Sequence, residues 1–248
     1  MGEMGVWERE PPQVRIPYSD QGVMGDAETG FFTPFAMWGN YFVRDGDRVY
    51  IYGAWLRAQL DHRLLVARVN DVQSVDDLLA FENWEFWEGN SWLKRDPTHP
   101  LAVFAGQATA QSNSPPMPTG EFSVVRIPAS GGPANRWALV YGLDAVHVAV
   151  APNAWGPFVE VARHDLRACN YFDYDEDEKL VNAYGIKAHE HLSDDHDLLV
   201  SFILNPIVPG AVLEDPSRYV PRFLKIPWAS ILRPSIWDSA ISRPRLRP

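Results

Sequence analysis

Four reactive side chains stand within five positions of the chain, in the segment Lys187-Ala188-His189-Glu190-His191. Histidine and glutamate are common zinc ligands, but the helical zinc signature needs a second histidine four residues after the first, where this chain has a serine. The flanking pattern predicts a strand, in which His189 and His191 share one face and Glu190 points to the other. Because no other cluster in the sequence supplies a third ligand, we expect no metal at this segment.

Two carboxylates near the starts of predicted strands are candidates for acid/base chemistry. Glu121 opens the apolar segment "EFSVVRI" after a proline-rich loop, where a half-desolvated carboxyl group could stay protonated and act as a general acid. Asp26, in "VMGDAETG", precedes another strand-like segment and could be the second carboxylate. Both could instead be solvated turn residues. Two carboxylates suffice to hydrolyse a glycosidic bond, with a separation of about 5–5.5 Å for retention and about 6.5–9.5 Å for inversion.

Short strands dominate the expected structure, because 21 Pro and 17 Gly divide the chain into pieces that mostly alternate apolar and polar residues. Ser74 is expected to cap one helical turn. Three units of about four strands are predicted, and "FAMWGNYFV" is the expected first strand of the first unit. That unit continues with residues 47–55 and 62–70 and a Trp-rich edge strand. The second comprises 121–128, 136–143, 145–152 and 159–165, and the third 184–193, 198–205 and 219–228.

Repeated units of this size are typical of β-propeller blades. We therefore predict an all-β protein, with residues 1–248 forming a single propeller domain of antiparallel four-stranded blades. Strand spacing alone does not distinguish a propeller from a sandwich. In a propeller, the first strand of each unit lies on the axis, where ligands bind.

Composition narrows the expected partners. The net charge of −10, without a cluster of basic residues, disfavours nucleic acid. No apolar run approaches 18 residues, and the first ten residues contain no apolar signal region, so we expect neither membrane insertion nor a signal peptide. No nucleophile elbow, dinucleotide fingerprint or P-loop motif is present. The 12% of aromatic residues can pack between sheets or provide flat platforms for sugar rings.

Seven segments resemble, in the same order, motifs of the domain of unknown function 4185 family: "VYIYGAW", "LLVARVNDVQSVDDLLAFENWEFWEGNSW", "EFSVV", "APNAWGPF", "YGIKAHEHLS", "LLVSFILN" and "YVPRFLKIP". The resemblance covers about residues 36 to 228. It implies a five-bladed propeller related to arabinanases and β-xylosidases, and an activity similar to the endo-D-arabinanases of glycoside hydrolase family 183. By this resemblance Glu121 matches a family glutamate, and Lys187 and His189 match a family lysine and histidine.

Two departures from the family pattern affect the expected site. The family glutamate two positions after the histidine is His191 here, and Glu190 is new. Only three blades are readable where five are expected, so Asp26 alone is available as the base of the first blade. An N-terminally shortened relative would explain this difference, and the family resemblance would then suggest a secreted protein.

We therefore expect a glycoside hydrolase that acts on a furanose-containing polysaccharide such as arabinan. Glu121 would be the general acid and Asp26 or Glu190 the second carboxylate. The alternative is a non-catalytic carbohydrate-binding or degenerate propeller. No organic cofactor is expected and no axial calcium is signalled, and the protein is expected to be a monomer whose partner is a polysaccharide or oligosaccharide. The predicted substrate-binding residues are Lys187, His189, Trp38, Trp55 and Asn40.

Overall fold

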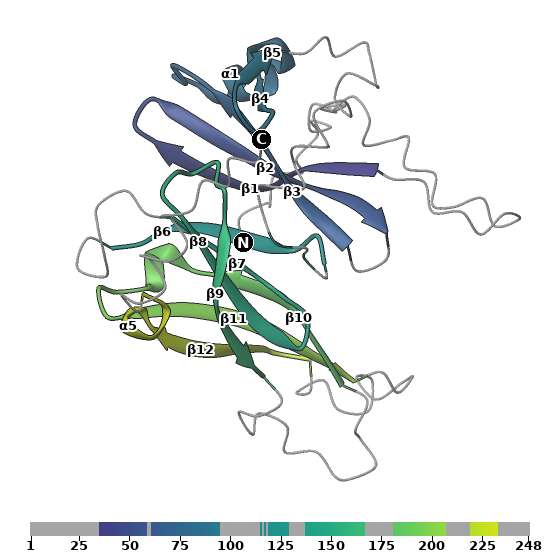
Figure 1. Ribbon diagram of the computed structural model, residues 1–248, viewed down its shortest axis with the longest axis vertical. Helices are drawn as coiled ribbons and strands as arrows, with labels where there is room; N and C mark the ends of the chain where they lie inside the picture. Colours follow the sequence, from purple (N-terminus) through teal and green to yellow (C-terminus); the bar gives the residue numbers. More distant parts are fainter. Residues whose placement is uncertain are drawn as a thin grey trace, which may run out of the picture.

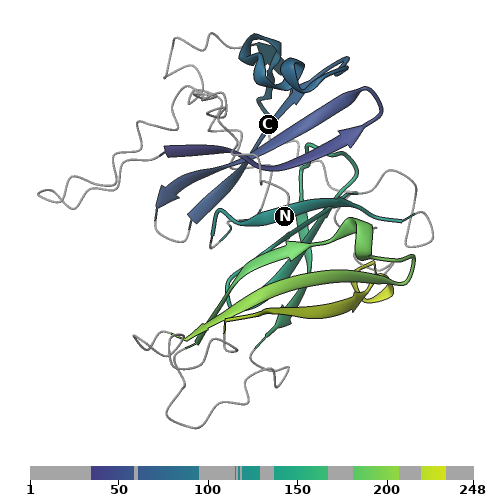
Figure 2. The same ribbon diagram turned by 180° about the vertical axis from the view of Figure 1, so that it is seen from behind.

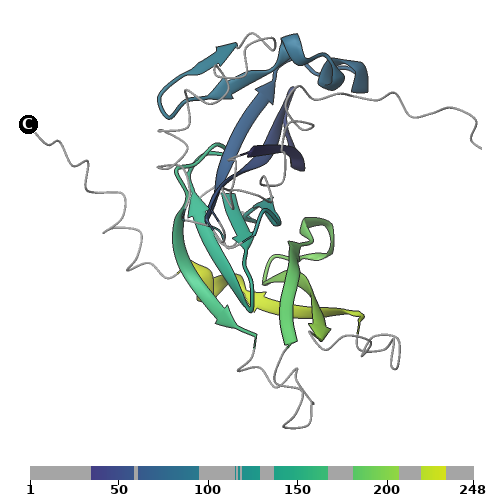
Figure 3. The ribbon, with the colours of Figure 1, turned by 90° about the vertical axis from the view of Figure 1, so that its right-hand side faces the viewer.

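The computed structural model describes residues 35–58, 61–94, 115, 117, 119–128, 137–166, 181–206 and 219–232. These residues form three antiparallel sheets that follow one another along the chain. Figures 1 and 2 show the second sheet lying between the first and the third, and Figure 3 shows the strong twist of the strands. The prediction of an all-β protein built from antiparallel strands is confirmed.

The first sheet has five strands in sequence order. Its strands are β1 (Phe35–Asp45), β2 (Arg48–Ala58), β3 (Asp61–Val69), β4 (Glu85–Trp87) and β5 (Trp92–Lys94). Strands β2 and β3 extend further into the predicted turn between them than the sequence suggested. The short helix α1 (Val75–Leu79) and a 3₁₀ turn (Phe81–Asn83) connect β3 to β4. The predicted cap is confirmed, since Ser74 and Asp77 form a reciprocal capping box.

The second sheet has four strands and the third has three among the described residues. They are β6 (Phe122–Arg126), β7 (Trp137–Tyr141), β8 (Ala145–Ala151) and β9 (Val159–Asp165), followed by β10 (Val181–Ala188), β11 (Asp197–Pro206) and β12 (Pro221–Pro227). A 3₁₀ turn (Glu190–Leu192) follows β10, and helix α5 (Trp228–Ile231) follows β12. A turn with a cis Gly156–Pro157 peptide bond joins β8 to β9.

Strands β6, β7 and β8 of the second sheet are buried on both faces. One face packs against the first sheet in what we call the first seam, which includes Tyr52, Leu64, Phe122 and Leu139. The other face packs against the third sheet in the second seam, whose side chains include Val125, Val140, Val148, Ile186, Val200 and Phe202. Because successive side chains of a strand point to opposite faces, both sets of alternating residues must be apolar. Strands β6, β7 and β8 are accordingly apolar at most positions.

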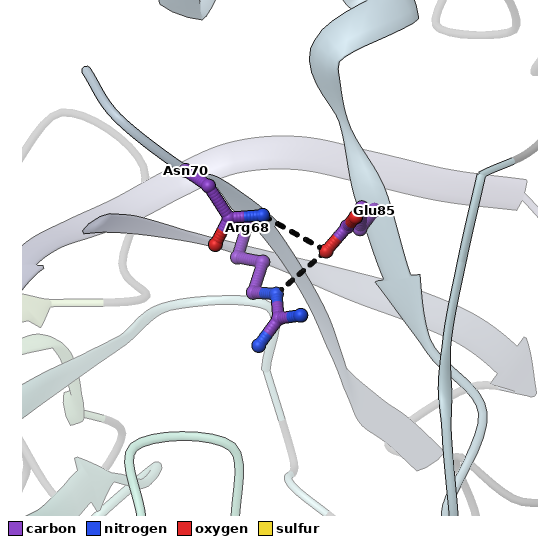
Figure 4. Close-up of polar contacts among 3 residues, drawn as sticks. All are labelled: Arg68, Asn70 and Glu85. Carbon is purple, nitrogen blue, oxygen red and sulfur yellow. Dashed lines mark hydrogen bonds and ion pairs between the residues drawn. The ribbon is translucent and has the colours of Figure 1, made fainter. Parts of the chain in front are cut away.

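An aromatic and charged cluster lies at the margin of the first seam. Trp155, from the turn between β8 and β9, contacts Trp87 and Trp92 of the first sheet at ring-centroid distances of 5.8 Å. The Arg68 guanidinium lies 4.2 Å over the Trp92 ring. Arg68 Nε and Asn70 Nδ2 both donate to Glu85 Oε2, at 2.8 and 3.0 Å (Figure 4). Burial alone would raise the pKa of Glu85, but these hydrogen bonds and the Arg68 charge outweigh it and lower that pKa.

The first strands of the three sheets lie side by side and run in the same direction. Strand β6 contacts both β1 and β10. Between β1 and β6, Asn40 bonds to Gly120 near one end, and Asp45 pairs with Arg126 at 2.6 Å near the other. Between β6 and β10, the contacts likewise advance in the same direction along both strands, from Glu121 with Gly185 to Ser123 with Ala188 at the end of β10. Residues far apart in the sequence therefore meet along a single junction.

We predict that Tyr52→Phe destabilises the protein by about 1–3 kcal/mol, because the buried Tyr52 hydroxyl donates to Ala154 O at 2.9 Å across the first seam. Without it, a buried carbonyl loses its donor. Urea unfolding measures the change in the free energy of unfolding. Tyr219→Phe, at a 43% exposed side chain, serves as the control and should shift the free energy by less than about 0.5 kcal/mol. Equal effects of the two changes would contradict this role for Tyr52.

Candidate functional site

Glu121 lies at the junction of the first strands, immediately before β6. Its Oε2 accepts a hydrogen bond of 2.7 Å from the backbone N–H of Gly185 in β10. That N–H is available because the pairing of β10 with β11 shifts register between Tyr184 and Lys187. Gly185 has φ +66°, a conformation that glycine adopts without the strain of a side chain. The β-bulge therefore redirects a backbone donor from the sheet to the carboxylate.

Lys187 lies directly beyond this bulge. Its Nζ donates to Phe122 O at 2.9 Å, so the amine lies across the junction between β10 and β6. Burial lowers the pKa of Lys187, and the nearby negative charge of Glu121 offsets part of that effect. The structure thus brings together Glu121 and Lys187, two of the residues that the sequence selected, although 65 positions separate Lys187 from the Phe122 carbonyl.

Asn40 reaches the same junction from β1. Its Nδ2 donates to Gly120 O at 2.7 Å, one residue before Glu121. On the other side of β6, Ser123 Oγ accepts from the backbone N–H of Ala188 at 3.0 Å. These side chains satisfy backbone groups of strands that no sheet ladder joins. They also hold the backbone on either side of Glu121 in place.

A pair of tyrosines adjoins Glu121, and the sequence analysis did not select it. The hydroxyl groups of Tyr184, in β10, and Tyr219, before β12, are hydrogen-bonded to each other. This hydrogen bond, with smaller effects of burial and of the Tyr219 and Glu121 charges, raises the pKa of Tyr184 to about 12. Tyr184 is therefore a neutral phenol at physiological pH, suited to hydrogen bonding and ring contact.

His189 lies just after the end of β10. Its Nε2 is 2.7 Å from Ser201 Oγ, and its ring centroid is 6.1 Å from that of Phe223. Burial lowers the pKa of His189, and the proximity of His191 lowers it further. The expectation that His189 and His191 share a strand face is wrong, because β10 ends at Ala188. The 3₁₀ turn that follows instead sets the two imidazole rings nearly perpendicular, 6.0 Å apart.

Glu190 begins that 3₁₀ turn and is exposed. It lines a pocket of about 170 Å³ whose other walls include Arg126, Asp194 and Trp228. Arg126 is the last residue of β6, whereas Glu121 precedes its first residue. The structure therefore places Glu190 beside the far end of β6 from Glu121.

Of the remaining predicted site residues, the structure describes Trp38 in full, only the backbone of Trp55, and nothing of Asp26. Trp38 packs edge-on against Trp84 and Phe86, with centroids 5.8 and 5.3 Å away, on the face of the first sheet opposite the first seam. For Trp55 the backbone is described, paired in β2, but the side chain is not. Asp26 lies outside the described residues.

Two general findings concern the described part of the chain. It contains no group of three or more histidine, cysteine, aspartate or glutamate residues that could hold a metal ion. Within the same residues, no helix has both the length and the apolar character needed to cross a membrane.

The fold is thus an all-β arrangement of antiparallel sheets, with a carboxylate held where their first strands meet. The chain belongs to the family described as domain of unknown function (DUF5005), whose model matches residues 16–229. Its fold is similar to that of a crystal structure from Bacteroides ovatus ATCC 8483 described as a "putative hydrolase", with a TM-score of 0.51 and 18% identity. The match covers 90% of this chain and 53% of the other, so this chain spans about half of that neighbour's length. No curated protein matches the chain.

We predict that His189 titrates below pH 6.5 in the folded protein, because burial and His191 both disfavour its charged form. Acid then favours the unfolded chain, which binds the proton more readily, so this group removes stability as the pH falls below about 6.5. NMR titration of the imidazole protons measures the midpoint. His191→Asn should move the midpoint upward. A wild-type midpoint at or above 6.5 would contradict the prediction.

Proposed function

We propose that this protein is a carbohydrate-active propeller that hydrolyses glycosidic bonds in a furanose-containing polysaccharide such as arabinan. The observation that carries the proposal is the position of Glu121. Its carboxylate is held by the Gly185 N–H at the junction of three first strands, with Lys187 and Asn40 on either side. A carboxyl group fixed in this way, with hydrogen-bonding neighbours, can donate a proton to the oxygen of a leaving sugar.

Support for the propeller comes from the arrangement of the sheets. In a propeller, the first strands of successive blades run parallel around an axis, as β1, β6 and β10 do here relative to one another. The five-bladed form, the relation to the domain of unknown function 4185 family and the assignment to glycoside hydrolase family 183 are part of the same proposal. The description of the Bacteroides ovatus neighbour as a "putative hydrolase" agrees with a hydrolytic function.

In the proposed reaction, Glu121 protonates the oxygen of the leaving sugar. A second carboxylate, on the opposite side of the sugar ring, either activates a water molecule or attacks the sugar itself. Asp26 is the proposed second carboxylate, because Glu190 stands beside the far end of β6. Lys187, whose amine donates to the Phe122 carbonyl and senses the Glu121 charge, also donates to sugar hydroxyl groups. Asn40 fixes the backbone before Glu121 through Gly120.

A second candidate function is carbohydrate binding without hydrolysis. The observation that favours it is the separation of Glu190 from Glu121 along β6, which leaves a single described candidate carboxylate at the junction. With one carboxylate the junction can still bind a saccharide through hydrogen bonds. It would then lack the partner that activates water or attacks the sugar.

We predict that Glu121→Gln lowers the rate of polysaccharide hydrolysis by at least about 100-fold, because an amide cannot donate the proton. The fold should persist, since the glutamine side-chain oxygen can still accept from the Gly185 N–H. Release of reducing sugar from arabinan measures the rate, and thermal unfolding checks the fold. Val159→Ala, at an exposed position of β9, is the matched control and should keep wild-type turnover.

Calorimetry with oligosaccharides then separates the two candidate functions. Hydrolysis by the wild type that is lost in both Glu121→Gln and Asp26→Asn supports the enzyme with these two carboxylates. Oligosaccharide binding by the wild type without any sugar release supports the binding protein. Unchanged turnover in Glu121→Gln would remove Glu121 from the mechanism.

A further inference from the structure

Each of the three first strands carries a glycine where it enters the junction. These are Gly39 in β1, Gly120 just before β6 and Gly185 in β10. Gly39 and Gly185 resemble each other closely, since both follow an aromatic residue and both lie where the strand pairing shifts register. Their φ angles are +82° and +66°. Strand β1 therefore has an irregularity that corresponds to the bulge of β10, which presents a donor to Glu121.

The residue after the glycine of one first strand bonds to the glycine of the next first strand. Asn40 follows Gly39, and its Nδ2 donates to Gly120 O at 2.7 Å. Glu121 follows Gly120, and its Oε2 accepts from the Gly185 N–H at 2.7 Å. The two contacts run in the same direction, from β1 to β6 and from β6 to β10. Asn40 is thus the counterpart of Glu121 on the preceding first strand.

Strands β1 and β6 stay in step beyond this contact. Five positions after Asn40 and Glu121 come Asp45 and Arg126, whose side chains pair with each other at 2.6 Å. Asn40 and Glu121 therefore stand at the same level, on neighbouring strands whose Cα atoms approach within 8 Å of each other. One bound sugar can reach both side chains.

Each of these two side chains has one oxygen that takes no part in the junction. Because Gly120 O can only accept, Asn40 must present its Nδ2 to it, and Asn40 Oδ1 is directed elsewhere. Glu121 Oε1 is the corresponding atom on β6. Among the residues that the structure describes, neither oxygen has a hydrogen-bond partner, and neither is a buried polar atom left without one. Both oxygens are therefore accessible to a ligand.

The chemistry of Asn40 Oδ1 limits what this ligand can be. An amide oxygen accepts hydrogen bonds and cannot donate, so the ligand must offer an O–H or N–H group. A cationic N–H donor would be repelled by the Lys187 amine, which bonds to the same strand as Asn40 does, two residues further along. A hydroxyl group donates without a charge. Asn40 also reaches toward β6, which already packs here, and away from any face that a further blade would cover.

We propose that Asn40 is a specificity-determining residue, whose Oδ1 accepts a hydrogen bond from a hydroxyl group of the sugar that Glu121 protonates. This inference rests on the proposed function. The Asn40 amide then has two roles, because its nitrogen fixes Gly120 while its oxygen contacts the substrate. A site that bonds a substrate hydroxyl discriminates against the analogue without it, because the protein group is left unpaired.

The test is a double-mutant cycle between the protein and its substrate. Wild type and Asn40→Ala are assayed on arabinan oligosaccharides and on a series in which one hydroxyl of the sugar at the scissile bond is replaced by hydrogen. In the wild type, loss of the contacted hydroxyl should lower kcat/KM about fivefold or more, whereas in Asn40→Ala it should lower it less than about twofold. A purely structural role of Asn40 predicts no such difference, because a displaced backbone impairs every substrate alike.

Thr119 offers a matched control, because it also fixes the backbone beside Glu121. Its Oγ1 accepts from the Glu121 N–H at 3.3 Å and donates to Glu121 O at 3.4 Å. Thr119→Val should lower kcat/KM by the same factor for all substrates of the series. Asn40→Asp keeps an accepting oxygen but cannot donate to Gly120 O, so it should lose stability in thermal unfolding and retain the discrimination of the wild type.

The inference is overturned if every hydroxyl deletion lowers kcat/KM by the same factor in the wild type and in Asn40→Ala. If the wild type binds oligosaccharides without cleaving them, the same cycle is measured by calorimetry, and equal factors there overturn the inference as well. If Glu121→Gln abolishes hydrolysis and no hydroxyl couples to Asn40, only the Asn40 inference fails. If Glu121→Gln cleaves as the wild type does, the proposed role of Glu121 fails, while a coupled hydroxyl still assigns the contact to Asn40.

Discussion

Burial of strands β6, β7 and β8 on both faces of the second sheet is the constraint on which the rest of the structure depends. Strands β6, β7 and β8 are apolar on both sides, so they are stable only with a sheet packed on each face. The first sheet packs on one face in the first seam, and the third sheet packs on the other face in the second seam. Packing them against one central sheet also brings their first strands against β6. The junction that holds Glu121 is a consequence of this packing.

The junction has a property that a continuous sheet does not have. Neighbouring first strands belong to different sheets, so no regular ladder satisfies the backbone groups on the edges that face one another. Side chains do so instead: Asn40 and Lys187 bond to carbonyl groups at the start of β6, and Ser123 accepts from β10. The bulge at Gly185 offers its N–H to Glu121 in the same way. The same side chains that satisfy the backbone groups of the junction therefore also form an ordered polar site around Glu121.

Much of the fold was predictable from local pattern. Alternation and turn residues identified the strands and their division into three groups, and Ser74 indicated the helical turn. Glu121 was selected as a candidate from its place before an apolar strand and Lys187 by resemblance to a family, but neither signal indicated that the packing of β6 against β10 brings the two close together. The strand through His189 to His191 was wrong, because periodicity does not reveal where a chain leaves a sheet for a 3₁₀ turn. The Tyr184–Tyr219 pair was missed because its partners lie 35 residues apart.

The sequence by itself determined which segments form strands and which of their faces are apolar. These properties depend on the period of apolar side chains along a strand, which the local sequence contains. Only the tertiary structure decided which polar residues meet. It joined Glu121 to Gly185 and separated Glu190 from both. The physical reason is that these contacts arise from the packing of one sheet on another, which no single strand specifies.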